Sequence, residues 1–294
     1  MRIVAAALLV ICGIGTTACD KLGLGDDDDP TSPTNPTPSA PVRYTPVGAS
    51  DVVGIGSTAP CLAIFGDCPT GKGYPFVAAA QLRSQGHTVS VYHLGFPTAT
   101  ISRRFMDLGT RYGHVVVANF MDSAVPFVPR DSTVVTIFAG GNEVNVITAA
   151  LGAGGGGASP AAFIDQQVLN FAADYMTVVS AIRERISSSG RIIALNLPNL
   201  SRMPYVATAP LAQRQAVHRA SLGMTTSAIN PLASQGVRVV DLMCLAALYQ
   251  PASLSSDGFH PSDAGYALIA AEVVRAITAT TFAAPLGSCP QMSM

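Results

Sequence analysis

The 294-residue chain contains no tryptophan, and aromatic residues make up only 6% of it. Few rings are therefore available to stack against sugars, so recognition of a carbohydrate by stacking is not favoured. Charged residues are scarce too, at 12%, and the formal net charge is −1. A nucleic-acid-binding protein needs a basic face, so this class of function is excluded.

Long hydrophobic runs are also missing, although 49% of the residues are hydrophobic and the mean hydropathy is +0.38. The only uninterrupted apolar run of any length is N-terminal, and it is too short to span a bilayer. The remaining length is enough to bury one large core and stays within the size of a single α/β domain.

Residues 1–19 have the pattern of a secretory signal, a basic start followed by a short apolar core. Cys19 comes after small residues, and this stretch resembles the cleavage site of a bacterial lipoprotein, where the cysteine becomes the acylated first residue. Thr16 departs from that pattern, because an aliphatic residue is usual three positions before the cysteine. Ordinary cleavage near Ala18, with an incidental cysteine, is the alternative.

Residues 20–42 combine a run of consecutive aspartates with prolines spaced among serine and threonine. Such a segment cannot bury enough apolar surface to fold, and its prolines keep it extended. The aspartates lack the spaced ligand pattern of a calcium loop. We therefore expect a tether between an acylated Cys19 and a globular domain at residues 43–294. The protein would be an exported lipoprotein of the cell envelope, in the periplasm or at the cell surface, anchored to the membrane.

Six cysteines in an exported chain indicate disulfide bonds. Four remain if Cys12 leaves with the signal and Cys19 carries lipid. These candidates are Cys61, Cys68, Cys244 and Cys289. Three pairings are possible; joining the first two would close a local loop, and joining the last two would pin the C-terminal tail to the end of a strand. No C-x₂-C pair supports a zinc site instead, and we expect neither a metal nor a cofactor.

Strand and helix patterns alternate from residue 43 onward. Strands are predicted at residues 43–47, 88–93, 133–139, 191–197 and 237–242. Helices are predicted at residues 74–84, 102–108, 163–187, 211–233 and 262–279. Strands separated by helices of this length indicate a parallel sheet covered on both faces. The expected fold class is therefore α/β, with a central parallel sheet between two layers of helices.

Near the C-terminus a carboxylate precedes a histidine by three residues, in Asp257-Gly258-Phe259-His260-Pro261. Across a turn, this spacing lets the carboxylate accept a hydrogen bond from Nδ1–H of His260, which would leave Nε2 free to take a proton. Such a histidine needs a nucleophile, and the best candidate is Ser50, which follows the first predicted strand. These three residues together predict a serine ester hydrolase.

Three further groups would stabilise the oxyanion that forms when Ser50 attacks an ester. They are the backbone N–H of Ser50 itself, the backbone N–H of Gly95 and Nδ2 of Asn142. All of them follow predicted strands, and in open α/β sheets ligands bind beyond the carboxyl ends of the strands. We therefore expect these groups to meet at one site.

The segments that carry these residues resemble the motifs of the SGNH (GDSL) hydrolase family. In the family's order, the matching segments are Gly48-Ala49-Ser50-Asp51 with Gly54, then Gly95, then Gly140-Gly141-Asn142-Glu143, and last Asp257-Gly258-Phe259-His260-Pro261. The resemblance extends from residue 43 to about 280. It implies a flavodoxin-like three-layer α/β/α sandwich and ester hydrolase activity. It also implies that the family's functional residues fall on Ser50, Gly95, Asn142, Asp257 and His260.

Two residues depart from the family pattern. Ala49 stands where an aspartate usually precedes the serine and braces the nucleophile loop, and the neighbouring Asp51 is a possible substitute. Glu143 stands where the family has an aspartate after the asparagine, which is a milder change. Neither departure removes a reacting group, so activity is expected. Because Val52 is not glycine, the motif is not the Gly-x-Ser-x-Gly elbow of α/β-hydrolases.

Each candidate also has a purely structural explanation. Ser50 could cap the helix that follows it, Asn142 could be a turn residue after two glycines, and Asp257 could be an ordinary loop residue. Ser57 is a weaker alternative nucleophile. The other histidines have no comparable partner and are expected to be structural or at the surface: His87, His93, His114 and His218.

These features predict a monomeric esterase or lipase that forms an acyl-enzyme on Ser50 and acts on small-molecule or lipid esters. The segment from Val144 to Ala162 is apolar and glycine-rich, and we expect it to line a pocket for the acyl chain. Within it, Gly152 to Gly157 lacks the ending of a phosphate-binding loop. Two alternatives remain, a polysaccharide O-deacetylase of the same fold and a non-catalytic surface lipoprotein that retains the scaffold.

Overall fold

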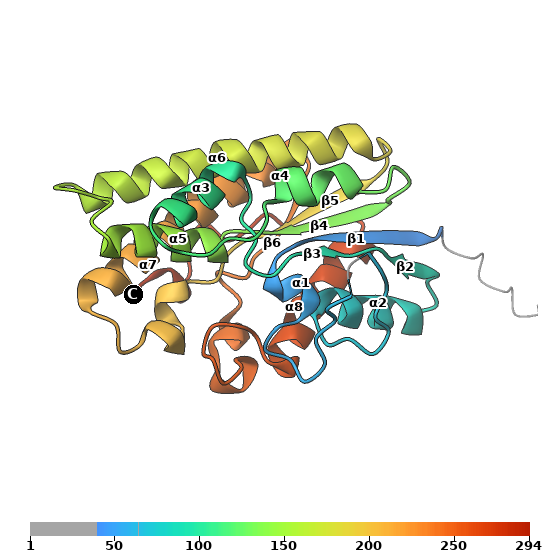
Figure 1. Ribbon diagram of the computed structural model, residues 1–294. Helices are drawn as coiled ribbons and strands as arrows, with labels where there is room; N and C mark the ends of the chain where they lie inside the picture. The colour runs from blue at the N-terminus through green and yellow to red at the C-terminus, as the bar shows by residue number, and fades with distance from the viewer. Residues whose placement is uncertain (1–39, 64) are drawn as a thin grey trace, which may run out of the picture. The chain divides into compact units, whose positions relative to one another are not determined.

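The computed structural model describes residues 40–63 and 65–294. The predicted signal, Cys19 and nearly all of the predicted tether lie outside the described residues. From residue 40 onward the chain folds into three layers, with helices on both sides of a central sheet (Figure 1). The expected α/β/α sandwich is confirmed.

In the described residues the sheet contains six strands, and every pair of neighbours is parallel. The strands are β1 (Val42–Gly48), β2 (Val89–Val91), β3 (Leu94–Gly95), β4 (Val134–Phe138), β5 (Arg191–Leu195) and β6 (Arg238–Val240). Their order is β2-β1-β4-β5-β6, and β3 also pairs with β1. The strand order therefore reverses between β1 and β4, which is where open α/β sheets of flavodoxin-like type bind their ligands.

The carboxyl ends of four strands lie in one row. Gly48 of β1 pairs with Phe138 of β4, Phe138 pairs with Leu195 of β5, and Leu195 pairs with Val240 of β6. Because these strands are parallel, the loop that follows each of them starts at the same edge of the sheet. The register therefore brings together segments that are far apart in the sequence.

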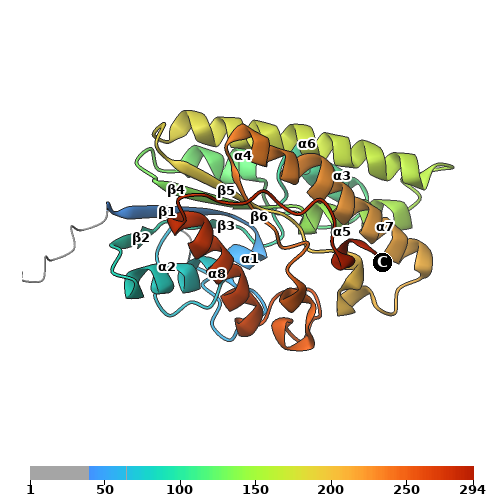
Figure 2. The ribbon, with the colours of Figure 1, turned by 180° about the vertical axis from the view of Figure 1, so that it is seen from behind.

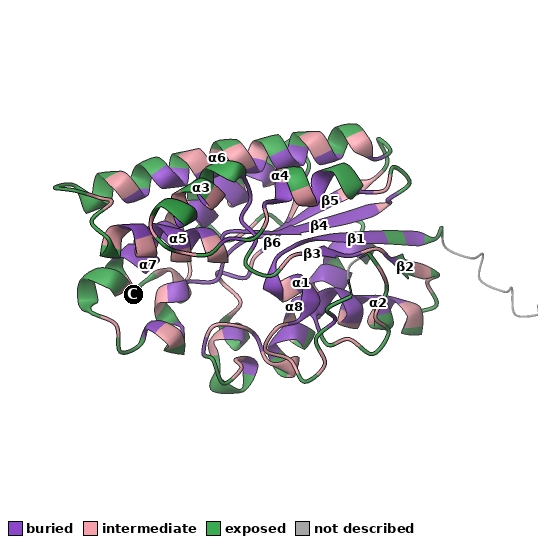
Figure 3. Ribbon diagram, viewed as in Figure 1, coloured by how far each residue is buried: buried purple, intermediate pink, exposed green. Residues whose placement is uncertain are grey.

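Helices cover both faces of the sheet (Figures 1 and 2). One face carries α3 (Arg103–Arg111), α4 (Phe120–Ser123), α5 (Gly141–Gly152), α6 (Pro160–Arg185) and α7 (Leu211–Gly223). The other face carries α1 (Ser50–Val53), α2 (Tyr74–Ser84) and α8 (Asp263–Thr278). All five residues of β4 are buried, as are nearly all of β1 and β5 (Figure 3). This explains why the strands appear in the sequence as continuous apolar runs.

The helix predicted over residues 211–233 is shorter than expected. The regular helix α7 stops at Gly223 and is followed by a π-helical turn, Met224–Ile229, and by 3₁₀ structure, Asn230–Gln235. Pro231 has no backbone N–H, so a regular helix cannot continue through it. No helix in the described part of the chain is both long and apolar enough to cross a membrane.

Helix α5 was not predicted, because two glycines stand at its start. Gly140, which precedes the helix, has φ of 121°, a backbone conformation that residues with a Cβ rarely adopt. A Cβ at this position would also lie 2.6 Å from Cδ1 of Leu197. Glycine at position 140 therefore permits the sharp turn from β4 into α5.

Candidate active site

Three segments at the carboxyl edge of the sheet carry the predicted site residues. Ser50 follows β1 and is the first residue of α1, and Asn142 follows β4 in the first turn of α5. His260 lies in the loop that leads into α8. The first two segments flank the reversal in strand order, and the loop of His260 reaches them from the end of the chain.

Ser50, His260 and Asp257 form a continuous hydrogen-bonded chain. Oγ of Ser50 lies 2.9 Å from Nε2 of His260, and Nδ1 of His260 lies 2.6 Å from Oδ2 of Asp257. When Nδ1–H donates to the carboxylate, Nε2 is the unprotonated nitrogen and can accept the proton of the serine hydroxyl. A nucleophilic serine requires this order of base and orienting group.

Asp257 is held by several donors at once. Its Oδ1 accepts hydrogen bonds from the backbone N–H groups of Phe259 and His260, at 2.8 and 2.9 Å, and from the hydroxyl of Ser255 at 2.7 Å. Burial alone would raise the pKa of Asp257, but His260 and these donors together hold the pKa well below its usual value. The carboxylate therefore stays ionised at neutral pH in a fixed orientation.

Asp51 is a second carboxylate at the site. It lines a cavity next to Ser50, and burial raises its pKa, while the charge of His260 acts in the opposite direction. A hydrogen bond from its own backbone N–H also lowers this pKa, so the contact that Asp51 makes in the nucleophile segment is within its own residue.

The side chain of Asn142 is fixed by a contact outside its own helix. Its Nδ2 donates a hydrogen bond of 2.7 Å to the carbonyl oxygen of Ala99. A side-chain amide has two N–H donors, so the second one remains for another acceptor. Asn142 is a residue of the first turn of α5 rather than of an irregular turn.

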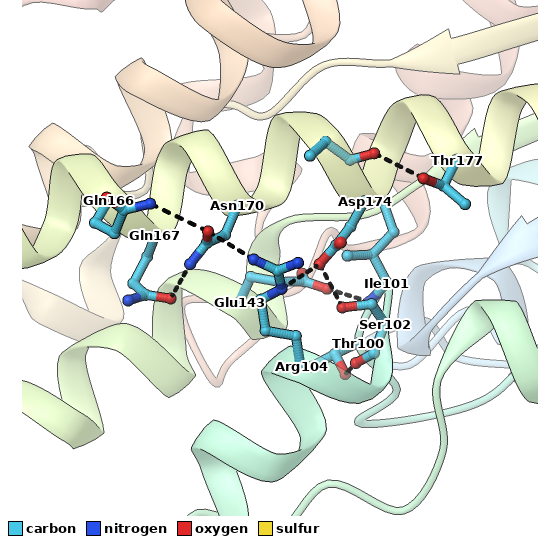
Figure 4. Close-up of polar contacts among 11 residues, drawn as sticks. Thr100, Ile101, Ser102, Arg104, Glu143, Gln166, Gln167, Asn170, Asp174 and Thr177 are labelled. Atoms are coloured by element: carbon cyan, nitrogen blue, oxygen red, sulfur yellow. Dashed lines mark hydrogen bonds and ion pairs between the residues drawn. The ribbon is translucent and has the colours of Figure 1, made fainter.

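Glu143, the next residue, is 1% exposed, and it accepts a hydrogen bond from the backbone N–H of Ile101 (Figure 4). Burial raises the pKa of Glu143 to about 7, although the hydrogen bond from Ile101 lowers it in part. Sequence reasoning treated Glu143 only as a mild departure from the family motif. Its position directly after Gly140-Gly141-Asn142 is the signal that could have identified it as a buried hydrogen-bond acceptor.

The segment that Glu143 holds is also attached to α6. The hydroxyl of Ser102 donates to Oδ2 of Asp174 at 2.6 Å, and Nε of Arg104 lies 3.5 Å from the same oxygen (Figure 4). These contacts fix the chain directly after Ile101. Since Ala99 belongs to the same segment, they also fix the acceptor that orients Asn142.

Gly95 packs closely against α1, and the oxyanion role predicted for its N–H stays a prediction. Gly95 lies in β3 and is not one of the residues that line the cavity next to Ser50. A Cβ on Gly95 would lie 2.7 Å from Cγ1 of Val52 and 2.8 Å from Cγ1 of Val53. Glycine is therefore explained by the close packing of α1 on β3. Ala99 lines the cavity instead.

The alternative explanations for the serines can be compared with the geometry. Ala49 precedes α1 and no side chain caps this helix, whereas the hydroxyl of Ser50 is bonded to His260. The hydroxyl of Ser57 donates to the carbonyl oxygen of Gly54 at 2.6 Å. Ser50 thus has a base within reach, and Ser57 has a local backbone acceptor.

Two of the remaining histidines have structural contacts. His93 is buried and packs edge-on against Phe76, with 5.4 Å between the ring centroids, and Nδ1 of His218 lies 3.3 Å from Oδ1 of Asn199. His114 lines an open groove beside His260, a proximity that the sequence did not indicate. In the described part of the chain, no cluster of three or more His, Cys, Asp or Glu side chains could hold a metal ion.

The apolar cavity beside Ser50 is built mainly from loops. Its apolar walls include Leu197, Leu200, Met203, Leu248, Leu254 and Phe259. No residue of the segment 144–162 lines it, whereas Leu151 and several glycines of that segment line a separate pocket. Val144 and Ile147 of α5 are fully buried in the core, and their apolar character comes from that packing.

Two disulfide bonds join the four predicted cysteines, Cys61 to Cys68 and Cys244 to Cys289. The second bond ties the C-terminal tail to the loop after β6. The tail continues to the loop after β5, where Nδ2 of Asn199 donates to the carbonyl oxygens of Gln291 and Ser293, at 2.9 and 3.0 Å. A wall of the apolar cavity is thus attached to the tail.

Comparison with protein families gives one match to this fold and site. The model of the GDSL-like Lipase/Acylhydrolase family matches residues 48–268. This span includes every segment that meets at the site, from Ser50 to His260. A comparison with curated proteins found no match.

Several solved structures share the fold. A lipase, Lip_vut3, from a goat rumen metagenome has 17% identity and a TM-score of 0.52, over 81% of this chain and 97% of that one. An extracellular lipase from Streptomyces rimosus has 15% identity and a TM-score of 0.52, over 81% and 100%. The phospholipase A1 from Streptomyces albidoflavus NA297 has 16% identity and a TM-score of 0.51, over 82% and 100%. Identities this low establish the likeness of the fold.

Proposed function

The chain belongs to the GDSL-like lipase/acylhydrolase family and is a carboxylic ester hydrolase, and on this premise we propose that it cleaves its substrates through an acyl-enzyme on Ser50. The observation that carries the proposal is the hydrogen-bonded order Ser50 Oγ, His260 Nε2, His260 Nδ1, Asp257 Oδ2. A hydroxyl placed this close to an oriented imidazole can lose its proton as it attacks.

Ser50, His260 and Asp257 act in turn in the proposed reaction. Oγ of Ser50 attacks the ester carbonyl carbon while Nε2 of His260 takes the hydroxyl proton, and Asp257 stabilises the imidazolium that forms. The imidazolium then gives its proton to the alkoxy oxygen as the carbon–oxygen bond breaks and the alcohol leaves. Water, activated by His260 in the same way, releases the acid and restores the serine.

The oxyanion is stabilised by donors that the fold holds in place before the reaction. The backbone N–H of Ser50 is available because the first residue of a helix has no carbonyl one turn earlier to bond. The second Nδ2–H of Asn142 is available because its first is held by Ala99. We do not assign a third donor to Gly95, because it does not line the cavity next to Ser50.

Active-site labelling tests this proposal directly. A fluorophosphonate probe is expected to modify Ser50, and Ser50→Ala should lose labelling and lower kcat for a short-chain p-nitrophenyl ester by roughly 10³-fold or more. Ser57→Ala is the matched control and should keep both. Full turnover in Ser50→Ala, or labelling of Ser57, would contradict the assignment and would favour a scaffold without this nucleophile.

The proposal includes export and anchoring through Cys19, with residues 1–19 as signal and 20–42 as tether. Two disulfide bonds in the described domain support an oxidising compartment. Expression in a bacterial host with labelled palmitate should give a lipid-modified protein in the membrane fraction. Cys19→Ser should abolish the label. Cleavage elsewhere with an unmodified Cys19 would overturn the lipid anchor while leaving the enzyme proposal intact.

A further inference from the structure

Two spaces of opposite character adjoin the site. The apolar cavity is lined by Ser50 and Asn142 but by neither His260 nor Asp257. An open groove is lined by His260 and Asp257 but not by Ser50. Phe259 lines both and lies between them. The nucleophile therefore faces one space, and the base faces the other.

The proton path decides which half of an ester each space holds. In ester cleavage the histidine delivers its proton to the oxygen of the departing alcohol, so the alcohol must lie on the side of His260. The acyl carbon bonds to Ser50 and its oxygen turns towards Asn142, so the acyl chain extends on the side away from His260. The cavity thus matches the acyl group and the groove matches the alcohol.

The two spaces also differ in the chemistry of their walls. Leu200, Met203 and Leu248 of the cavity are almost fully buried, and no charged group faces them except Asp51 and Glu143 near Ser50. The groove presents polar side chains from four segments of the chain, His114, Asn145, Tyr205 and Gln213. Among the described residues these four side chains form no hydrogen bond, and the hydroxyl of Tyr205 is buried without a partner.

From these observations, and resting on the proposed acyl-enzyme at Ser50, we propose that the preferred substrates join an acyl chain longer than acetyl to a polar, hydroxyl-bearing alcohol such as glycerol. The chain would lie among Leu200, Met203, Leu248 and Leu254. The alcohol would lie in the groove, where the side chains of Asn145 and Gln213 can hydrogen-bond to its free hydroxyl groups.

A series of p-nitrophenyl esters from acetate to octanoate tests the acyl half, because the alcohol stays constant. In the wild type, kcat/KM should rise by roughly fourfold for each methylene buried, until the cavity is full. Leu254→Trp should lower the ratio of hexanoate to acetate kcat/KM by roughly tenfold, since Leu254 is only partly buried and a larger ring would project into the cavity. Met203→Ala should move the optimum towards longer chains.

Leu151→Trp is the control for the acyl half. Leu151 is also partly buried, and it lines a separate pocket beside the glycine-rich turn that follows α5. Its substitution should leave the chain-length profile unchanged. A flat profile in the wild type, or a profile that shifts with Leu151 and not with Leu254 or Met203, would overturn the assignment of the cavity. Thermal unfolding of each variant shows whether it has folded.

The alcohol half is tested with two esters of one acid, glycerol monobutyrate and ethyl butyrate. The wild type should prefer the glycerol ester, and Asn145→Ala combined with Gln213→Ala should reduce that preference by roughly fivefold or more. Gln215→Ala is the matched control, since Gln215 lies on the same helix as Gln213 but lines a groove between α6 and α7. Equal use of both esters, or an effect of Gln215→Ala equal to that of the double variant, would overturn the assignment of the groove to the alcohol.

Failure of this inference is distinguishable from failure of the proposed function. If Ser50 is not the nucleophile, Ser50→Ala retains turnover on every ester in both series. If the two spaces are wrongly assigned, Ser50→Ala is inactive while the ratios among esters do not respond to the cavity and groove variants.

Discussion

Oγ of Ser50 lies 2.9 Å from Nε2 of His260, although 210 positions separate the two residues in the sequence. The contact depends on the loop before α8, which returns over the carboxyl end of β1. The first turns of α8, directly after this loop, are held to the segment that follows α1 by two hydrogen bonds. The hydroxyl of Tyr266 donates to the carbonyl oxygen of Ile55 at 2.6 Å, and the backbone N–H of Thr58 donates to Oδ1 of Asp263 at 2.8 Å.

Removing the charge of Asp257 should cost most of the activity. In Asp257→Asn the group facing Nδ1 no longer favours the required tautomer, so we expect kcat to fall by roughly 10²- to 10⁴-fold with little change in KM. Steady-state kinetics on a p-nitrophenyl ester measure this. Ser255→Ala is the control, because it removes only one of the hydrogen bonds to Asp257 and should cost less than about tenfold. Equal losses in both variants would argue against an orienting role.

Glu143 should make folding stability fall as the pH rises. Its pKa is about 7 in the folded protein, above the ordinary value of 4.5, so the folded state binds the proton more tightly than the unfolded state. The free energy of unfolding should therefore decrease between about pH 4.5 and pH 7, by at most on the order of 3 kcal/mol, and then level off.

Glu143→Gln isolates this effect, because glutamine can still accept the hydrogen bond from Ile101 but cannot ionise. Urea denaturation at pH 5 and pH 8 should show that the variant gains stability relative to the wild type as the pH rises. A difference between the two proteins that is the same at both pH values would show that Glu143 does not titrate in this window.

Gly95→Ala should disturb the nucleophile without touching it. The added methyl would come within 3 Å of Val52 and Val53, so α1 must move away from β3, at a cost of about 1 to 3 kcal/mol in stability. Because Ser50 begins α1, kcat should fall as well. Gly287→Ala serves as the control, since a Cβ there meets nothing within 4 Å. A Gly95→Ala protein as stable and active as Gly287→Ala would refute the packing explanation.

The two disulfide bonds should contribute unequally to stability. They join cysteines 45 and 7 positions apart, and the chain-entropy relation gives about 4 kcal/mol for the Cys244–Cys289 bond and about 2 kcal/mol for the Cys61–Cys68 bond. Unfolding of the two double Cys→Ser variants in urea measures the difference. A larger loss from the short loop would mean that native contacts, rather than the unfolded chain, set the contribution.

The strands and the residues that follow them could be predicted from the sequence because both are local signals. β4 and β5 are apolar runs with clear ends, and α2 has the bounds that its pattern predicts. The contact between Asp257 and His260 is local, because a separation of three residues across a turn brings the carboxylate next to the imidazole ring. The contact between Ser50 and His260 is not local, and it could be predicted only because an oriented histidine base needs a nucleophile beside it.

The features that could not be predicted depend on contacts between distant segments. Leu200 and Leu248 lie in short 3₁₀ turns of two different connections, so nothing in the sequence marks them as walls of one cavity. A glycine leaves room either for a substrate oxygen or for a closely packed helix, so the sequence could not show that Gly95 packs against α1. The two cases differ only in what lies opposite, here Val52 and Val53.

The row formed by Gly48, Phe138, Leu195 and Val240 separates two kinds of connection. The segments after Gly48 and Phe138 are short and carry Ser50 and Asn142. The long segment after Leu195 contributes walls of the cavity, whereas the long segment after Val240 contributes walls and also carries Asp257 and His260. Residues in the connection after Leu195 can therefore be exchanged while Ser50, His260 and Asp257 stay in place. Engineering a new ester preference into this protein should begin at the connection after Leu195, which contributes Leu197, Leu200 and Met203 to the cavity.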